Sequence, residues 1–498
     1  MSDVLLAIWA FFQNNILPKP AFFVGFIVLL GYLLLKKPFY EALAGFIKAT
    51  VGYMILNVAS SGLVTNFRPI LAGLNGRFKL NAAVIDPYFG QAAAQKAVEA
   101  VGKSFAMMMQ VLLLAFIWNL VLVLLRKVTK VRTVFITGHI MVQQSSTALW
   151  LVLFAFPELQ QIPTLIMLGL LLGTYWAVFS NLSVESTQEL TGGGGFAIGH
   201  QQMFGIWLTD KLSTAMGKKK KGKAIEDLKL PGFLSIFNEN VVATSILMTI
   251  FFGIIIAILG EPYMRELDTA GFAKTQNFIF YIVEKSLFFA VYVSILQLGV
   301  RMFVSELHES FQGISQKLLP GSLPAVDCAA SYGFGHPNAI TIGFLFGAVG
   351  QFIAILGLLV FKSPVLIITG FVPVFFDNAT FAVFANKKGG LRAAMLIPFL
   401  SGLLQVIGGA FAAFYFQLGK YGGWHGNFDW DTLWPVMGWL IKNAQYVGLV
   451  VCIVAMLAVP QLQYYFGKYR RENYFKVAND FNNAVSEEAK QEAAVAAK

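Results

Sequence analysis

Charged residues and cysteine are both scarce in this 498-residue sequence. Asp, Glu, Lys and Arg make up 13% of the residues, hydrophobic residues make up 57%, and the mean hydropathy is +0.66. Because soluble domains are about one-quarter charged, this composition excludes an ordinary soluble protein and indicates a membrane protein. The two cysteines, Cys328 and Cys452, show neither CxxC nor zinc-ligand spacing, so the sequence predicts no disulfide framework and no metal site.

Motifs of catalysis are missing as well. The sequence has no GxxxxGK[ST] loop, which excludes ATP hydrolysis by a P-loop, and its four consecutive glycines, 192–195, lack the lysine and the strand of such a loop. Cys328 follows Asp327, but a neighbouring carboxylate raises the pKa of a thiol and makes it less reactive. The histidines in the best polar motifs come with amides rather than with further metal ligands. We therefore predict neither an enzyme nor a bound cofactor or metal.

Long apolar runs fill most of the chain instead. A helix needs about 20 mostly apolar residues to cross a bilayer, because a helix satisfies its own backbone polar groups in hydrocarbon. The sequence predicts an all-α polytopic membrane protein with about eleven transmembrane helices and with re-entrant hairpins. The predicted spans are 20–36, 41–62, 105–125, 133–156, 162–182, 242–260, 278–300, 337–361, 364–384, 392–418 and 435–459.

Basic residues gather in short clusters beside these runs. The net charge is +11, but the basic residues form no single stripe, so nucleic acid is not a predicted partner. Cytoplasmic loops are rich in Lys and Arg, and all the clusters lie on that side if the N-terminus is outside, the C-terminus is inside and the chain crosses eleven times. The clusters are Lys36-Lys37, Arg126 to Arg132, Gly217 to Lys223, Lys387 with Lys388 and Arg392, and Arg470-Arg471.

Two further segments, one at the N-terminus and one near the middle of the chain, need separate interpretations. The N-terminal segment 1–13 has no basic n-region and no small-residue cleavage site, and is expected to belong to the mature protein. The lysine run 217–223 is expected to be a solvated cytoplasmic surface that contacts anionic lipid or an acidic partner. The bilayer is therefore the first predicted partner of the chain.

The two halves of the chain resemble each other. "VFITGHIMVQQSS" (134–146) aligns with "LIITGFVPVFFDN" (366–378), and "AVID" ending at Asp86 aligns with "PAVD" ending at Asp327, at offsets of about 232 and 241 residues. Each half would hold five spans, and because five is odd, the second half enters the membrane from the opposite side. The pattern predicts an inverted repeat of the kind that secondary transporters use for alternating access. Chance similarity between apolar segments is the alternative.

This repeat divides the chain into four parts. The predicted organisation is a first repeat at 1–182, a cytoplasmic and glycine-rich hairpin linker at 183–241, a second repeat at 242–418, and a last span with a cytoplasmic tail at 419–498.

Two candidate hairpins carry acidic residues at membrane depth. In "NAAVIDPYFG", Pro87 disfavours a continuous helix through Asp86 and leaves Tyr88 at the same break. In "LLPGSLPAVDCAASYGFGHPNA", prolines and glycines lie on both sides of Asp327. Broken helices of this kind expose backbone groups to a substrate, so both hairpins are candidate binding elements.

Histidine with paired glutamine occurs twice. His139 and Gln143 share a helical face through their i, i+4 spacing, and Gln144 follows them. His200 and Gln201 follow the four glycines, whose backbone bends freely. Amides and imidazoles both donate and accept hydrogen bonds, as a small polyhydroxylated ligand requires.

Each candidate residue has a purely structural alternative. A single buried His or Gln is often a hydrogen-bond partner between helices, and Asp327 has Arg301 or His336 as possible structural partners. The tryptophans at 424, 430 and 434 are expected to be anchors at the outer interface, and His425 among them a solvated loop residue.

Several long motifs, in order, resemble one family. "RTVFITGHIMVQQ", "TQELTGGGGFAIGHQQMF", "EDLKLPG", "VRMFVSELHESFQGIS" and "LPGSLPAVDCAASYGFGHPNA" are similar to the ascorbate-specific permease, the enzyme IIC component of the bacterial phosphoenolpyruvate-dependent phosphotransferase system. The resemblance implies a homodimer in the bacterial inner membrane, with eleven spans in two inverted five-span units. Its core and dimerisation domains are interleaved along the chain, and the core moves against the dimerisation domain in an elevator-like form of alternating access.

The resemblance also implies a division of labour. L-ascorbate is taken up from the periplasm and phosphorylated by a separate IIB protein, which a IIA protein recharges. This chain has no CxxGxGxS-like phosphorylation loop, so it would select and move the substrate without carrying the phosphoryl group. The substrate contacts implied at matching positions are Ser60, Tyr88, His139, Gln143, His200, Gln201 and Asp327, and the residue pattern adds Asp86 and Gln144. Pro87 departs from the family pattern, because a hydroxyl residue is usual before the tyrosine.

Two other functions stay open on the sequence. One is a proton- or sodium-coupled secondary transporter of a small polar solute, with Asp327 and the histidines as coupling groups. The other is a membrane-embedded enzyme, which the lack of catalytic groups disfavours.

Overall fold

The computed structural model describes residues 19–78, 81–219 and 231–496, together with residues 7, 11, 15, 225 and 228. Most of the N-terminal segment 1–13 and most of the lysine run 217–223 therefore lie outside the described residues. Within the described residues, eight helices are long and apolar enough to cross a membrane. The chain is thus an all-α polytopic membrane protein, and eleven spans stays a prediction. The eight candidates are Phe39–Ala59, Met107–Leu124, Gln161–Thr191, Val241–Leu259, Phe278–Ile295, Pro337–Val360, Pro373–Tyr415 and Phe428–Phe466.

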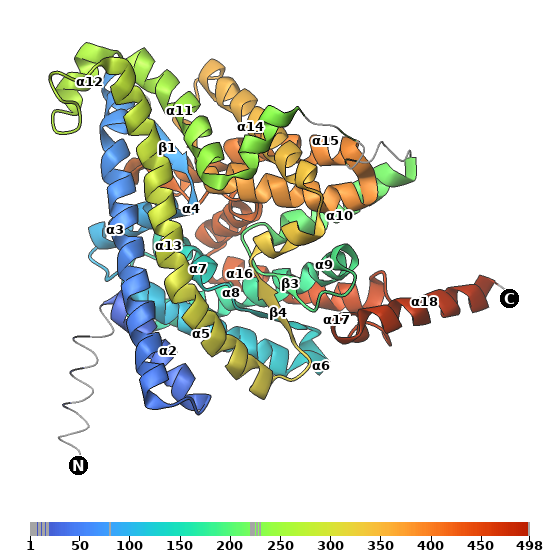
Figure 1. Ribbon diagram of the computed structural model, residues 1–498. Coiled ribbons are helices and arrows are strands. Elements are labelled where there is room, and N and C mark those ends of the chain that lie inside the picture. The colour runs from blue at the N-terminus through green and yellow to red at the C-terminus, as the bar shows by residue number, and fades with distance from the viewer. Residues whose placement is uncertain are drawn as a thin grey trace.

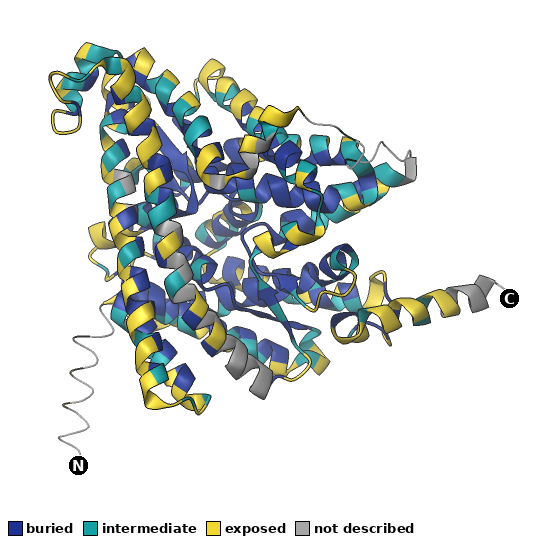
Figure 2. Ribbon diagram, viewed as in Figure 1, coloured by how far each residue is buried: buried dark blue, intermediate teal, exposed yellow. Residues whose placement is uncertain are grey.

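Two unusually long helices form one side of the molecule. Helices α3 (Phe39–Phe78) and α13 (Phe278–Leu318) lie side by side, with α2 (Pro20–Leu34), α11 (Asn240–Leu259) and the short α12 (Glu261–Leu267) packed against them (Figure 1). These long helices carry many exposed residues (Figure 2). On α3, exposed apolar residues recur every three or four positions at Leu43, Ile47, Val51, Met54 and Val58. Such a stripe suits lipid or another apolar helix.

The other helices form a second layer, most of which is more deeply buried (Figure 2). In the first half they are α4 (Pro87–Ala100), α5 (Met107–Leu124), α6 (Arg126–Thr129), α7 (Gly138–Ala155), α8 (Gln161–Leu182), α9 (Val184–Thr191) and α10 (Met203–Lys219). In the second half they are α14 (Pro337–Val360), α15 (Asn378–Tyr415), α16 (Phe428–Phe466), α17 (Lys476–Asn479) and α18 (Phe481–Ala496). Short helical turns are η2 (Gly232–Asn238), η3 (Cys328–Phe334), η4 (Pro373–Asp377) and η5 (Leu418–Tyr421).

Helices α15 and α16 each reverse direction. The backbone of Gly390 has φ 63° and ψ −162°, and that of Gln445 has φ 51° and ψ −129°, neither of which is helical. The two arms of α15 lie against each other, because Asn378 at its start donates a hydrogen bond of 3.4 Å to Gln405 in the second arm. The break between the predicted spans 364–384 and 392–418 coincides with the first turn. The predicted span 435–459 crosses the second turn, so its ends belong to different arms.

Two small parallel sheets lie at the centre of the second layer. In one, β1 (Asn81–Ile85) lies between β5 (Val365–Thr369) and β6 (Gly423–Trp424). In the other, β4 (Leu323–Val326) lies between β2 (Thr133–Phe135) and β3 (Ala197–Ile198). Each central strand therefore comes from one half of the chain and its neighbours from the other half.

The strands correct two predicted spans. The runs 133–156 and 364–384 were expected to be helical throughout, but each begins as a strand, β2 and β5. Both strands are rich in β-branched residues and are fully buried, and they pair with segments almost 200 residues or more away. Apolarity alone does not separate a buried strand from a helix.

Small residues let α14 and α15 approach closely. A methyl group added at Gly402 of α15 would overlap the carbonyl oxygen of Gly347, and one added at Gly350 of α14 would overlap that of Phe399. Because lipid tails are as apolar as side chains, such close packing is a main source of helix association in membranes.

We expect Gly350→Ala to destabilise the protein, by roughly 1 to 3 kcal/mol as for other overpacked sites. Gly357→Ala, on the same helix, is the matched control, because an added methyl group there meets no atom within 4 Å. Alanine is also the better helix former, so the control should be neutral or stabilising. Thermal unfolding in detergent measures both variants, and equal transition temperatures would contradict this account of the helix contact.

Candidate functional site

Polar residues follow the strands of both sheets. Asp86 follows β1, Asp327 follows β4, His200 lies two residues after β3, and His425 directly follows β6. His139 lies at the start of α7, four residues after β2. Ligands bind at the carboxyl ends of parallel strands, where the chain leaves the sheet and new helices begin. The fold thereby brings together candidate residues that are far apart in the sequence.

A histidine and a carboxylate form the centre of this cluster. His139 Nε2 lies 3.2 Å from Asp327 Oδ2, and the rings of His139 and His200 meet edge to face with centroids 6.2 Å apart. The other carboxylate oxygen of Asp327 accepts a hydrogen bond from the backbone N–H of Ala329. Among the described side chains, the partner of Asp327 is thus His139 and not His336, and the side chain of Arg301 lies outside the described residues. The side chain of Asp327 is 36% exposed, so it is the open member of the pair.

The glutamines join the two His-Gln motifs. Gln201 donates a 2.6 Å hydrogen bond from Nε2 to Gln143 Oε1. Gln144 is fully engaged in the scaffold: its Oε1 accepts from the indole of Trp176, and its Nε2 donates to the carbonyl of His200. The two motifs that the sequence singled out therefore contact each other directly.

Asp86 holds its hairpin in place. It is 1% exposed, and its two carboxylate oxygens accept from the backbone N–H groups of Tyr88 and Val372, at 3.0 and 3.3 Å. Tyr88 is buried beside Gln143 and within the electrostatic reach of Asp327. Asp86 thus caps α4, which begins at Pro87. Through Val372 it also holds the segment that follows β5. Ser60 lies in α3, and its side chain is outside the described residues.

His425 belongs to the cluster, which corrects the sequence-based expectation. It is 0% exposed rather than solvated, its Nε2 contacts Gln201 Oε1, and its Nδ1 lies 2.8 Å from Thr147 Oγ1. The ring stacks on Trp430 at a centroid distance of 4.1 Å, and Trp430 stacks on Trp434 at 4.3 Å. His425, like His200, follows a two-residue strand and precedes a helix, and this is the signal that could have identified it.

The tryptophans were also wrongly placed by the sequence. Trp424, Trp430 and Trp434 are 0%, 0% and 1% exposed, so they are core residues and not interface anchors. The physical reason is that α16 begins at the centre of the protein, and its first turns pack between other helices instead of reaching the surface.

Two further buried carboxylates fix the helices that follow the sheets. Asp377 accepts from the backbone N–H of Phe428 at 2.7 Å and from the side chain of Asn427 at 2.8 Å, at the start of α16. Asp429 accepts from the backbone N–H groups of Phe204 and Gly205 at 3.0 and 3.1 Å, at the start of α10. Negative charge is stabilised at a helix N-terminus, so these carboxylates are satisfied without a cation.

Burial and neighbouring charges act differently on the pKa values of His200 and Asp327, which both lie outside the candidate spans. Burial lowers the pKa of His200 to about 4, which outweighs the opposite influence of Asp327. Burial also raises the pKa of Asp327, but the hydrogen bond from His139 and the nearby imidazoles outweigh it and hold that pKa well below its usual range. At neutral pH the cluster therefore offers a neutral imidazole and an ionised carboxylate.

This set of groups suits hydrogen bonding to a polar solute. Imidazole and amide groups donate and accept, and the carboxylate accepts two or more bonds. One ligand atom from each of His139, His200 and Asp327 also lies within 4.8 Å of the others, a geometry that can hold a metal ion.

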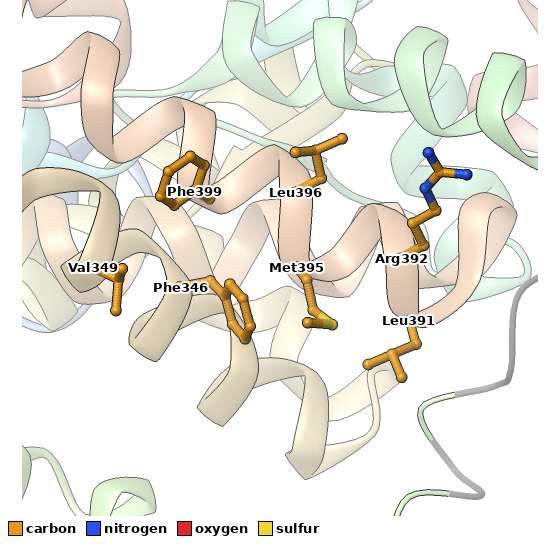
Figure 3. Close-up of a pocket in the computed structure, with 7 residues that line it drawn as sticks. All are labelled: Phe346, Val349, Leu391, Arg392, Met395, Leu396 and Phe399. Atoms are coloured by element: carbon orange, nitrogen blue, oxygen red, sulfur yellow. The ribbon is translucent and has the colours of Figure 1, made fainter. Parts of the chain in front are cut away.

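The described surface also has hollows of a different character. One of about 690 Å³ lies between α14 and α15, lined by six apolar side chains and Arg392 (Figure 3). It contains none of the polar candidate residues, so it lacks the hydrogen-bonding groups that a polar solute needs.

Comparisons with known proteins give one family. A family model described as "PTS system sugar-specific permease component" matches residues 15–431. The "Ascorbate-specific PTS system EIIC component" of Mycoplasma pneumoniae is 33% identical over 449 residues. That alignment covers 80% of this chain and 66% of the relative, so the chain spans somewhat less than two thirds of the relative's length.

We expect Thr147 and His425 to be energetically coupled. Thr147→Val and His425→Phe each leave a buried polar partner without its hydrogen bond, whereas Phe can still stack on Trp430. The double variant should therefore be less destabilised than the sum of the single variants, by about 0.5 to 3 kcal/mol. The measurement is the unfolding free energy of the wild type, both single variants and the double variant in mixed micelles.

The matched control for this cycle pairs His425→Phe with Thr164→Val. Among the described residues, the Thr164 hydroxyl bonds only to the carbonyl of Gln160, the N-cap of its own helix, so the two effects should add. Simple additivity for Thr147 and His425 would show that their contact contributes nothing.

Proposed function

Because the chain belongs to the PTS sugar-specific permease family, we propose that it takes up L-ascorbate across the bacterial inner membrane. The described relative is named ascorbate-specific. L-ascorbate is a small, anionic molecule with several hydroxyl groups, and it needs both donors and acceptors within a short distance. The polar cluster at the strand ends supplies these groups in an otherwise apolar protein.

The observation that carries this proposal is the convergence of two pairs. His139 and Asp327 lie 3.2 Å apart, and Gln143 and Gln201 are joined by a 2.6 Å hydrogen bond. The Asp327 carboxylate accepts from substrate hydroxyls, and the His139 imidazole beside it supplies a further hydrogen-bonding group. The amides and His200 supply the remaining donors and acceptors.

The other predicted site residues take supporting or peripheral roles in the proposal. Tyr88 contributes its hydroxyl beside Gln143. Asp86 acts through Tyr88, whose helix it caps, and Gln144 acts by holding the carbonyl of His200. Ser60 would reach the substrate from α3, on the side of the two long helices.

Transport is proposed to be coupled to phosphorylation by partner proteins. A separate IIB protein transfers a phosphoryl group to L-ascorbate as it reaches the cytoplasm, and a IIA protein recharges IIB. The chain itself has no phosphoryl-carrying loop. Its contribution is therefore selection and movement of the substrate.

The proposed movement is elevator-like, with the second layer as the moving core. The order of elements supports two inverted repeats. The long helix, strand, helices and strands from α3 to α10 correspond in sequence order to those from α13 to the first arm of α16. The order of strands β5-β1-β6 matches β2-β4-β3 when first-half and second-half strands are exchanged.

The same arrangement suggests how two copies meet. The long pair α3 and α13 would form the fixed dimerisation domain, and the apolar stripe on α3 supplies a surface for a second copy or for lipid. The N-terminus is proposed to lie outside and the C-terminus in the cytoplasm, as the basic clusters indicate.

We expect Asp327→Asn and Gln143→Ala each to weaken the binding of L-ascorbate, by roughly tenfold or more, because a hydrogen bond to a charged or buried group contributes about 1.5 to 3 kcal/mol. Isothermal titration of purified protein in detergent measures the affinity. Gln161→Ala is the matched control, because Gln161 is exposed and its side chain bonds only to Gln110. Unchanged affinity in both site variants would remove the site assignment.

Uptake assays separate coupling by phosphorylation from the alternative of a proton- or sodium-coupled transporter. We expect ascorbate accumulation in cells to vanish when phosphoenolpyruvate or the IIB protein is removed, because neither the gradient nor this chain supplies the phosphoryl group. Accumulation that is abolished only by collapsing the ion gradient would favour the alternative.

A further inference from the structure

Three ligand atoms of types that bind transition metals meet at the centre of the polar cluster. One atom each from His139, His200 and Asp327 lies within 4.8 Å of the others. The sequence gives no sign of this set, because His200 lies 61 positions after His139 and Asp327 lies 127 positions after His200. The pairing of β4 with β2 and β3 is what brings them together.

The separation of the closest two atoms already fits a metal site. Zinc binds imidazole nitrogen and carboxylate oxygen at about 2.0 to 2.2 Å, so tetrahedral ligand atoms are about 3.3 Å apart. His139 Nε2 and Asp327 Oδ2 are 3.2 Å apart. The His200 nitrogen lies within 4.8 Å of the other two atoms, so its ring has to move closer when an ion binds, and a water oxygen completes four ligands.

The surroundings of His200 also match those of a metal ligand. Metal-binding histidines usually bond their second ring nitrogen to an oxygen, which fixes the ring orientation and leaves the other nitrogen for the metal. His200 Nδ1 lies 2.5 Å from Gln202 Oε1, so Nε2 is the free nitrogen. Asp327 is likewise oriented, because its second oxygen accepts from Ala329.

The second ring nitrogen of His139 differs from that of His200. His139 Nδ1 is buried and has no hydrogen-bond partner among the described residues. A buried polar atom without a partner is costly, and the ring of His139 is oriented by the contact of its Nε2 with Asp327 instead of by a second hydrogen bond. The side chain of His139 is 15% exposed, so a small ion can reach it.

We propose that His139, His200 and Asp327 form a binding site for a divalent transition-metal ion, of which Zn²⁺ is the best fit, and that a bound ion excludes the transported solute. The metal site itself does not depend on the proposed function. Exclusion of the solute does rest on it, because both would use His139 and Asp327.

The donor set defines which ions bind. Two imidazoles and one carboxylate favour Zn²⁺, Co²⁺ and Ni²⁺, whereas Mg²⁺ and Ca²⁺ prefer oxygen ligands alone. The site should therefore select the first group even when Mg²⁺ is in large excess.

The experiment is titration of Zn²⁺ into the full-length protein, purified in detergent without a histidine tag and with Mg²⁺ present throughout. We expect one ion to bind per chain. Asp327→Asn and His139→Gln should each weaken binding by about tenfold to a hundredfold or more, since even outer-shell changes have effects of that size. Asparagine still accepts the hydrogen bond of a helix cap, so Asp327→Asn should keep the fold.

The matched control is His336→Ala. His336 also lies near Asp327 in the sequence, but it caps the start of α14 through a bond from Asn338 to its Nδ1, and its loss should leave Zn²⁺ affinity unchanged. Co²⁺ in place of Zn²⁺ supplies a visible absorption band that reports mixed nitrogen and oxygen ligation, and Asp327→Asn should change this band. A wild-type affinity equal to that of both site variants, or no binding at all, would overturn the metal site.

A competition arm distinguishes the two proposals. If Zn²⁺ binds with the expected dependence on Asp327 and His139 and L-ascorbate displaces it, both proposals are supported. If Zn²⁺ binds with this dependence but L-ascorbate binds without displacing it, the metal site is supported and the exclusion of the solute is wrong. If L-ascorbate binds normally and Zn²⁺ does not, the metal site is wrong and the proposed transport is unaffected.

Discussion

Backbone groups that leave a helix inside a membrane protein must find partners, because hydrocarbon offers none. This chain breaks its helices repeatedly near its centre, and each break is satisfied in one of two ways. Short strands pair in two parallel sheets, and buried carboxylates accept from the N-termini of the helices that follow. Asp86, Asp377 and Asp429 each accept hydrogen bonds from such backbone N–H groups. The rest of the site depends on these partners, because they fix where α4, α10 and α16 begin.

The two acidic hairpins share one backbone contact but differ in the partner of the second carboxylate oxygen. Asp86 and Asp327 follow the central strands of the two sheets, and both accept from a backbone N–H two residues later. Asp86 gives its second oxygen to the backbone of the opposite half and is closed to solvent. Asp327 gives its second oxygen to the side chain of His139 and stays partly exposed. A contact with a side chain can be exchanged for a ligand more readily than one with the backbone.

The polar cluster is held together by contacts among its own side chains and with neighbouring aromatic rings. His425 stacks on Trp430 and contacts Gln201, which in turn bonds to Gln143. Trp176 fixes Gln144 in the same way. These contacts limit the motion of the amide side chains, and side chains that are already ordered lose less conformational entropy on binding. The contacts also explain how a cluster of hydrogen-bonding groups persists within an apolar core.

The sequence by itself determined the class of protein, the family and the main polar residues. Apolar runs, basic clusters and breaks such as Pro87 are local features, and local features can be read without a structure. The strand pairing, the partner of Asp327 and the place of His425 were decided only by the tertiary structure. Strand β1 pairs with β5, which begins 284 residues after Asn81, and strands this short carry no local signal of their partners. The meeting of His139, His200 and Asp327 follows from such pairings, because it is set by long-range contacts and not by spacing along the chain.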